Sequence, residues 1–200
     1  MKFIVFEGLD GSGGTTQVDL LRRWLFTNGG VSVVETREPT RAPIGSLITK
    51  ALKGLTPISD HALPYLFAAD RRDHIDLKIR PALKRGAWVV SDRYALSSLA
   101  YQSAAIGFDR VVDLNQDILT PDLTIFLDLS PEACMERISK RGEAKERFEE
   151  LKILSSVREY YMRGLNLRKF TGDTVIIDAS LSIKEVQLKV QEACLPYMRS

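Results

Sequence analysis

A glycine-rich segment near the start of the chain has the residue types and spacing of a phosphate-binding loop. An apolar run, Phe3 to Phe6, precedes it, and a helix-like segment follows. Such a turn from strand to helix directs several backbone N–H groups at one point, where the helix dipole adds positive potential. The pattern G-x-x-x-x-G-K-[ST] is matched at Gly8, Gly13 and Thr15. The segment therefore predicts binding of a nucleotide's phosphates.

One position departs from this pattern, because Gly14 stands where the motif has lysine. Loss of one preorganised charged donor at a transition state typically costs about 10² to 10³ in rate. Thr15 keeps the hydroxyl that binds magnesium in such loops. A glycine-rich turn without any ligand is the alternative interpretation. If the loop binds phosphate, the residues expected around it are Gly8, Leu9, Asp10, Gly11, Ser12, Gly13, Gly14, Thr15 and Thr16.

Two carboxylates that end apolar runs compete for a second place at the magnesium ion. Asp92 follows Trp88-Val89-Val90-Ser91, and Asp128 follows Ile125-Phe126-Leu127. Ligands of open α/β sheets bind outside the carboxyl ends of the strands, so either side chain would project toward the loop. A carboxylate in that place can hold magnesium through water. The pattern alone does not choose between them.

Strand-like and helix-like segments alternate along the chain, which predicts a single α/β domain over residues 1–200. Apolar runs without strict alternation indicate parallel strands that helices cover on both faces. The strands are expected at residues 2–7, 31–36, 87–91, 123–128 and 174–178. Helices are expected at 15–26, 45–52, 59–80, 95–105, 110–119, 130–141, in a long segment ending near 170, and after the capping box Ser182 to Glu185.

Composition limits the partners that the chain is expected to have. The net charge of +2 is too close to balance to predict binding to nucleic acid or to a membrane surface. Cys134 and Cys194 have no metal or redox spacing, which favours buried thiols in a reducing cytoplasm. Nothing in the sequence resembles a signal peptide or a membrane span.

Six short motifs follow one another along the chain. They are FEGLDGSG at 6–13, TREP at 36–39, FAADR at 67–71, SDRY at 91–94, PDLTIFLD at 121–128 and RGEAKERFE at 141–149. Together they resemble the thymidylate kinases, a family of P-loop nucleoside-monophosphate kinases. The resemblance implies a three-layer P-loop fold with a short lid, the substrates ATP and dTMP, Mg²⁺, and the product dTDP. It also implies a homodimer.

The resemblance implies roles for side chains around the nucleoside of dTMP. Phe67 would stack on thymine and Arg71 would contact its carbonyl, although their spacing alone equally allows a core phenylalanine and a solvated arginine. Asp10 would lie beside the sugar 3′-hydroxyl. Four residues would lie at positions that line the nucleoside pocket: Ser97, Ser98, Tyr101 and Gln102. We favour Tyr101, with Ser98 near the base.

Further roles concern the phosphates. The resemblance selects Asp92 over Asp128 near magnesium and assigns Arg93 to the acceptor phosphate. Arg37 and Arg41 flank Glu38-Pro39, and one of them should also reach this phosphate. Arg41 is the one that we favour.

A charged segment at residues 141–149 is by itself typical of a solvated loop, but it resembles the lid that closes over ATP. Family members carry a catalytic arginine in the phosphate loop or in the lid. Gly11 occupies the loop position, so Arg141 or Arg147 should supply it. Such an arginine is worth about 10³ to 10⁵ in rate. We therefore predict an active kinase. The alternatives are a non-catalytic nucleotide-binding paralogue, a kinase of another pyrimidine monophosphate, and an ordinary kinase with a changed residue at position 14.

Overall fold

The computed structural model describes residues 2–140 and 147–198, and residues 147–150 by their backbone alone. Five parallel strands form one sheet in the order β2-β3-β1-β4-β5. The strands are β1 (Phe3–Gly8), β2 (Val33–Arg37), β3 (Trp88–Asp92), β4 (Leu123–Asp128) and β5 (Asp173–Asp178). The predicted α/β fold with a five-stranded parallel sheet is confirmed, and strand bounds differ from the expected ones by two residues at most.

The core follows the apolar runs of the three central strands. All residues of β1 are buried, as are nearly all of β3 and β4. The edge strand β5 buries only Ile177 fully. Central strands lie between two helical layers, so neither of their faces meets water. This position explains why their sequences lack the alternation of a half-exposed strand.

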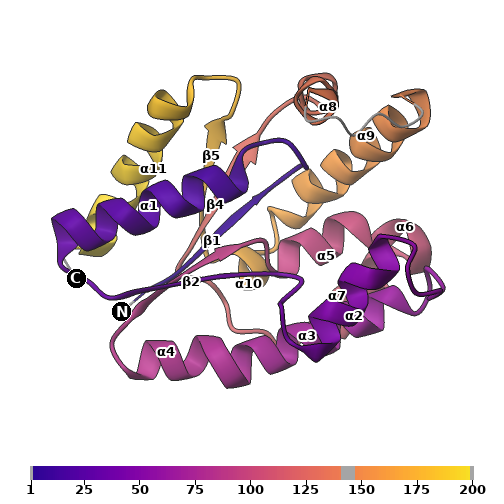
Figure 1. The fold of residues 1–200 in the computed structure, drawn as a ribbon, viewed down its shortest axis with the longest axis horizontal. Helices are drawn as coiled ribbons and strands as arrows, with labels where there is room; N and C mark the ends of the chain where they lie inside the picture. Colours follow the sequence, from indigo (N-terminus) through magenta and orange to yellow (C-terminus); the bar gives the residue numbers. More distant parts are fainter. Residues whose placement is uncertain (1, 141–146, 199–200) are drawn as a thin grey trace.

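Helices cover both faces of the sheet (Figure 1). On one face α1 (Gly14–Gly29) packs beside α11 (Ile183–Met198). On the other face α4 (Arg80–Lys84) packs on β3, and α5 (Ala95–Tyr101) packs on β1 with α9 (Arg147–Gly164) beside it. Two further helices complete the surroundings of the site, α2 (Pro43–Leu52) against α3 (Leu63–His74), and α8 (Pro131–Ser139) against α9. No helix among the described residues combines the length and apolarity needed to cross a bilayer.

The helix expected at 59–80 is interrupted by a wider turn. After α3 the chain forms a π-helix, η1 (Ile75–Ile79), and then α4. The amide of Arg80 bonds to the carbonyl of Ile75, five residues back. Pro81 lacks an N–H and its ring would clash with the preceding turn of a regular α-helix, so a π-turn there relieves the conflict.

Other helix bounds also differ from expectation. The segment expected at 95–105 forms α5 and α6 (Ser103–Ile106), and the segment expected at 110–119 forms α7 (Phe108–Leu114). Gly107, with φ +88°, lies between α6 and α7. The segment expected to run to about 170 forms α9 and the short α10 (Arg168–Thr171). Both predicted N-terminal caps are confirmed. Ser130 accepts from the Ala133 amide at 3.2 Å, and Ser182 accepts from the Glu185 amide at 3.3 Å.

Candidate active site

The loop from β1 to α1 has a backbone that glycine adopts most readily. The φ angles are +154° at Gly8, +86° at Gly11 and +105° at Gly13. A Cβ at Gly8 would lie 2.7 Å from the carbonyl oxygen of Leu127. The glycines therefore allow a close turn that leads straight into α1. The loop surrounds a cavity of about 150 Å³, the loop cavity, which residues 8–16 line together with Arg37, Asp92 and Arg93.

Asp92 and Thr15 lie side by side at this cavity. The Thr15 hydroxyl donates to Asp92 Oδ2 at 2.6 Å. A Cβ at Gly14 would lie 3.0 Å from Asp92 Oδ1, so the carboxylate also faces the position of the missing lysine. No three His, Cys, Asp or Glu among residues 2–140 and 147–198 group into a site that could enclose a metal. A hydroxyl and a carboxylate instead fit Mg²⁺, which commonly binds few protein oxygens together with water and phosphates.

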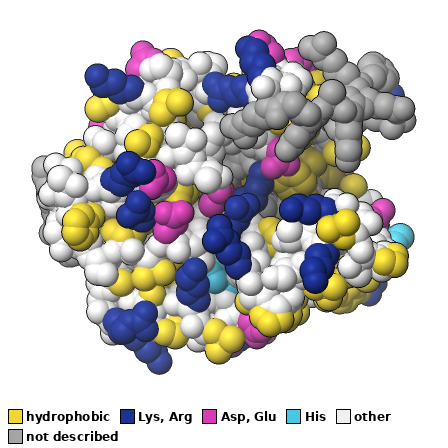
Figure 2. Space-filling view, viewed as in Figure 1, with side chains coloured by type: hydrophobic (Ala, Val, Ile, Leu, Met, Phe, Trp, Pro, Cys, Tyr) yellow, Lys and Arg dark blue, Asp and Glu magenta, His cyan; other side chains and the backbone are white. Residues whose placement is uncertain are grey.

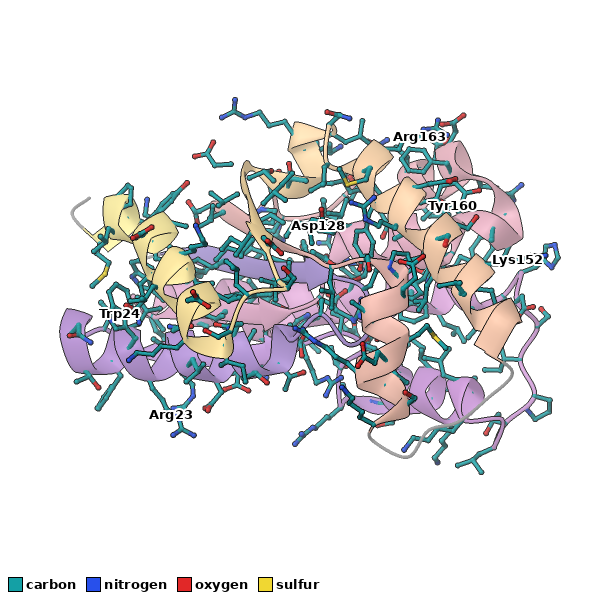
Figure 3. The ribbon with its side chains drawn as sticks, turned by 90° about the horizontal axis from the view of Figure 1, so that it is seen from above. Arg23, Trp24, Asp128, Lys152, Tyr160 and Arg163 are labelled. Atoms are coloured by element: carbon teal, nitrogen blue, oxygen red, sulfur yellow. The ribbon has the colours of Figure 1, made fainter. Side chains whose placement is uncertain are left out.

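Asp128, the competing carboxylate, is engaged elsewhere. Arg158 of α9 contacts it at two points, with Nε 3.1 Å from Oδ1 and Nη2 3.0 Å from Oδ2. Figure 3 shows Asp128 at the end of β4, near α9. Because this carboxylate is already paired with a guanidinium, the geometry favours Asp92 as the residue near the metal.

Arg93 directly follows β3, with φ at +69°, a value uncommon for a residue that is not glycine. Its Nη1 donates to the hydroxyls of Ser97 at 3.0 Å and Tyr161 at 2.9 Å. Its Nη2 donates to Asp10 Oδ1 at 2.8 Å and to the Tyr101 hydroxyl at 3.3 Å. Strained backbone is retained where its surroundings hold it, and it is common at functional sites. The guanidinium is therefore fixed at the mouth of the loop.

A buried carboxylate, Glu7, supports this arrangement and was missed from the sequence. Glu7 accepts from the Ser97 hydroxyl at 2.5 Å and from the Tyr161 hydroxyl at 3.2 Å. Its other oxygen accepts from the Tyr94 amide at 2.9 Å. Burial raises the pKa of Glu7, and this effect outweighs the Ser97 hydrogen bond and the positive charge of Arg93. Burial alone would lower the pKa of Arg93, but the neighbouring tyrosines and carboxylates raise it well above its ordinary value.

A second cavity, of about 380 Å³, opens on the other side of Arg93 and is called the acceptor cavity. It brings together six residues that were predicted to bind dTMP: Asp10, Phe67, Arg71, Arg93, Ser98 and Tyr101. Two helices, α3 and α5, supply four of these side chains, the loop supplies Asp10, and Arg93 directly follows β3. The acceptor and loop cavities share Asp10, Arg37 and Arg93, so the two cavities meet at these residues.

Gln102, at a position that the resemblance places at the nucleoside pocket, also lines the acceptor cavity. Its Oε1 is buried and has no hydrogen-bond partner among the described residues. A buried acceptor without a donor is uncommon in folded proteins and indicates that a ligand or water satisfies it.

Arg71 is 2 % exposed, so it is not the solvated arginine that its spacing alone allowed. Its Nε and Nη2 donate to Glu38 Oε2 at 2.9 and 2.7 Å. Nη2 also donates to the Ser98 hydroxyl at 2.9 Å, and Nη1 donates to Asn115. His74 contacts the other oxygen of Glu38 at 2.9 Å. The Arg71 guanidinium is thus held in one orientation at the wall of the acceptor cavity.

Arg41, the favoured contact for the acceptor phosphate, does not line either cavity as the described residues bound them. It lines a separate outer groove of about 400 Å³ between β2 and α3. Arg37 lines all three spaces. The geometry therefore favours Arg37 over Arg41 as the contact for the acceptor phosphate. Arg37 ends β2 beside the loop, whereas Arg41 lines only the outer groove. Figure 2 shows basic side chains gathered across the middle of this face.

A third cavity, of about 280 Å³, lies on the α11 side of the loop. Gly11, Gly13 and Thr16 line it together with Arg137 of α8 and Ser182. Arg137 Nη2 donates to the carbonyl of Ala179 at 2.9 Å, and Nη1 lies 3.4 Å from the carbonyl of Gly11. This arginine, also missed from the sequence, joins the loop to the segment after β5.

The predicted lid lies mostly outside the described residues. Arg141 is outside them, and so is the side chain of Arg147, although Arg147 begins α9. The described helices on either side, α8 and α9, pack against each other beside the loop.

The sequence is similar to those of known proteins along most of its length. The sequence model of a family described as thymidylate kinase matches residues 6–190. A probable thymidylate kinase of Pyrobaculum aerophilum is 41% identical over 194 residues, which cover 96% of this chain and 95% of that protein. A probable thymidylate kinase of Thermococcus kodakarensis is 39% identical over 198 residues, 94% of each protein. A thymidylate kinase of Synechococcus sp. WH7803 is 38% identical over 207 residues, 96% of this chain and 94% of that protein. The chain therefore belongs to the thymidylate kinase family.

Proposed function

We propose that this family member transfers the γ-phosphoryl group of ATP to dTMP, giving dTDP and ADP, with a loop that lacks the usual lysine. The observation that carries the proposal is the meeting of the two cavities at Asp10, Arg37 and Arg93. A nucleotide in the acceptor cavity would direct its phosphate at the two arginines, Arg37 and Arg93. A donor phosphate in the loop cavity would then lie next to it, as transfer between two nucleotides requires.

The acceptor cavity suits a pyrimidine monophosphate. Phe67 offers an aromatic face for the base, and Arg71 a fixed guanidinium for a base carbonyl. The unpartnered Oε1 of Gln102 can accept the N3–H of thymine. Ser98 and Tyr101 flank the nucleoside, and the Asp10 carboxylate can accept from the sugar hydroxyl.

The reaction needs positioning and charge stabilisation without a covalent intermediate. An oxygen of the dTMP phosphate attacks the γ-phosphorus, and the new P–O bond forms as the bond to the bridging oxygen breaks. That electron pair stays on the terminal oxygen of ADP. Arg93, fixed by Asp10 and Tyr101, would hold the attacking phosphate. Backbone N–H groups of the loop and of the first turn of α1 would hold the donor phosphates.

Thr15 and Asp92 would hold Mg²⁺, whose chemical contribution would be to neutralise charge on the donor phosphates. The cavity on the α11 side of the loop, walled by Arg137 and Ser182, would take the nucleoside of ATP. Arg141 and Arg147 are proposed to close over ATP and to add positive charge at the transferring group.

The second candidate function is that of a nucleotide-binding paralogue without catalysis, which Gly14 alone favours. An ADP-release assay with ATP, Mg²⁺ and dTMP separates the two. We expect turnover by this protein, with Gly14→Lys faster and Gly14→Ala no faster. Turnover in the lysine variant alone would support the paralogue and contradict an active site here.

The identity of the acceptor and the assembly are tested separately. dUMP and CMP in place of dTMP test the alternative pyrimidine acceptors, and a higher kcat/KM for either would contradict the dTMP assignment. We also propose a homodimer in the cytoplasm, as the family resemblance and the two free, buried cysteines suggest. Sedimentation velocity at micromolar concentration checks the dimer, and a single species of monomer mass would contradict it.

A further inference from the structure

Two residues of α3 hold the two oxygens of one buried carboxylate. Arg71 donates to Glu38 Oε2 through Nε and Nη2, and His74 Nδ1 lies 2.9 Å from Glu38 Oε1. The side chains of Arg71, Glu38 and His74 are 2 %, 3 % and 1 % exposed. A spacing of three places Arg71 and His74 on one face of the helix. The orientation of Glu38 is therefore fixed through both of its oxygens, away from solvent.

The contacts of the His74 imidazole assign its hydrogen. A carboxylate paired with a guanidinium is ionised, so the oxygens of Glu38 only accept hydrogen bonds. His74 Nδ1 must then carry the hydrogen that it shares with Glu38 Oε1. His74 Nε2 lies 2.6 Å from the Thr36 hydroxyl, which can donate to it. His74 is thus held at both ring nitrogens and supplies the donor for the second oxygen of Glu38.

His74 and Arg71 face different spaces. Arg71 and Glu38 line the acceptor cavity, whereas His74 and Thr36 line the outer groove. Within residues 2–140 and 147–198, His74 is not part of the acceptor cavity wall. A nucleotide in that cavity would contact Arg71 without contacting His74. Any effect of His74 on dTMP must therefore pass through Glu38 and Arg71.

The hydrogen bonds of Arg71 leave one of its five N–H groups for a ligand. Nε donates to Glu38, and Nη2 donates to Glu38, to the Ser98 hydroxyl at 2.9 Å and to the Tyr94 carbonyl at 3.1 Å. Nη1 carries two hydrogens but donates only once among the described residues, to Asn115. The second N–H of Nη1 is therefore the donor that Arg71 can offer to a base carbonyl.

We propose that His74 is a positioning residue that determines base specificity, because through Glu38 it fixes the Arg71 N–H that donates to the 4-carbonyl of thymine. The inference rests on the proposed kinase function. Cytosine carries an amino group at this position, and two donors that face each other in a buried site leave both unpaired. Without the His74 contact, Glu38 and the Arg71 guanidinium can turn, so the site loses its preference for a carbonyl.

Two substitutions of His74 separate its two contacts. His74→Asn places an amide N–H near the position of Nδ1 and keeps the donor to Glu38. His74→Gln places it near Nε2 and keeps only the contact to Thr36. Both remove a buried ring, so each controls for the loss of packing in the other. We expect His74→Gln to lower the ratio of kcat/KM for dTMP to that for dCMP about tenfold, and His74→Asn to change it less than about twofold. Equal ratios in the two variants would overturn the proposal.

A dTMP analogue with hydrogen in place of the 4-oxygen of the base locates the effect. The analogue lacks the acceptor for Arg71, so His74→Gln should lower its kcat/KM by less than about twofold, while kcat/KM for dTMP falls about tenfold. Equal losses for dTMP and the analogue would show that His74 only supports packing, and would overturn the proposal.

Binding gives a readout that does not depend on turnover. Calorimetry should show the same pattern in the Kd values of dTMP and the analogue. If no variant turns over, the kinase proposal fails, and the ratio of the two Kd values in the asparagine and glutamine variants still decides the role of His74. Equal Kd ratios would overturn this role. Far-UV circular dichroism checks the fold of each variant, and His74→Ala, which removes both contacts without adding bulk, replaces a glutamine variant that does not fold.

Discussion

At the scale of single residues, the site depends on buried side chains that fix the orientation of the residues facing the cavities. Arg93 keeps a left-handed backbone at φ +69° because its guanidinium is bonded on both sides and its neighbour Ser97 is bonded to Glu7. A residue held in this region costs about 1 to 3 kcal/mol, which the surrounding contacts must offset. Glu7 is thus a positioning residue, buried beside the loop and acting through Ser97 and Tyr161 on Arg93.

The raised pKa of Glu7 predicts a pH dependence of stability. Burial raises the pKa of Glu7 above its ordinary value of 4.5, so the folded protein retains a proton that the unfolded chain releases. The contribution of this group to the free energy of unfolding is therefore fully present below pH 4.5 and falls as pH rises toward the folded-state pKa. We expect Glu7→Gln to reduce this fall in urea unfolding between pH 5 and 8.

Glu185 provides a matched control with the opposite sign. The Ser182 hydrogen bond lowers the pKa of Glu185, so its contribution is present above its ordinary pKa and lost as pH falls. Glu185→Gln should leave the slope between pH 5 and 8 unchanged. If Glu7→Gln also leaves that slope unchanged, Glu7 does not titrate as described.

The sequence specified the loop glycines well but not the long-range partners. Gly8, Gly13 and Thr15 are fixed by a local turn, whose spacing is visible in the chain. Arg37 and Arg41 both flank Glu38-Pro39, and local spacing cannot distinguish them. Only the pairing of Arg37 with Asp92 across two strands separates them, and pairing is a property of the folded sheet.

At the scale of elements, α3 fixes the segment that follows β2. Asp70 of α3, 1 % exposed, accepts from the Thr40 amide at 2.7 Å and from the Thr40 hydroxyl at 2.6 Å. The Asp70 carboxylate thereby fixes the segment that leads from Arg37 to α2. At Gly45 a Cβ would lie 2.2 Å from the Thr40 carbonyl oxygen, so α2 also packs closely on it.

We therefore expect Asp70→Ala to destabilise the protein by about 1 to 3 kcal/mol, because it leaves the partly buried amide and hydroxyl of Thr40 without their acceptor. Loosening of the segment next to Arg37 should also lower kcat/KM. Urea unfolding and the coupled assay measure the two effects. Asp73→Ala is the control, since Asp73 is exposed and makes no hydrogen bond or ion pair within the described part of the chain. Equal stability of the two variants would contradict the role of Asp70.

The periodicity of the sequence predicted which segments form helices and strands, but it did not predict every interruption within a helix. Five strands and the capped starts of α8 and α11 were expected and are present. The π-turn before Pro81 was missed, because the apolar spacing continues through it. The interruption between α5 and α6 was also missed, whereas the break at Gly107 lies between the helices expected at 95–105 and 110–119. A π-turn depends on how one turn of helix accommodates a proline, and it does not change the apolar pattern of the flanking segments.

At the scale of the whole molecule, the order β2-β3-β1-β4-β5 brings the ends of β2, β3 and β1 together around the loop. The order is set by contacts between segments far apart in the chain, and the periodicity of single segments does not contain it. The six motifs did imply the strand order, because segments that match a family in sequence and spacing imply the fold of that family.

Labelling of the two cysteines can show whether this molecule unfolds globally or in separate parts. Cys134 of α8 lies beside the loop, where its carbonyl oxygen would be 3.0 Å from a Cβ at Gly11, and Cys194 lies in α11. Both side chains are 0 % exposed. Burial raises the pKa of each thiol to about 12, so neither reacts while buried. Labelling by a thiol reagent therefore requires the surrounding structure to open.

If opening is global, dTMP should protect both cysteines equally. Ligand at about 100 times its Kd lowers the open population about 100-fold, so both labelling rates should fall by that factor. The variants Cys134→Ala and Cys194→Ala assign each rate, and guanidinium-unfolded protein gives the limiting rate. Slowing of Cys134 alone would show that α11 opens by itself, as a helix on the β5 edge of the sheet could. Unchanged rates at both cysteines would contradict global opening, since a ligand that binds only the folded state must suppress every opening that destroys its site.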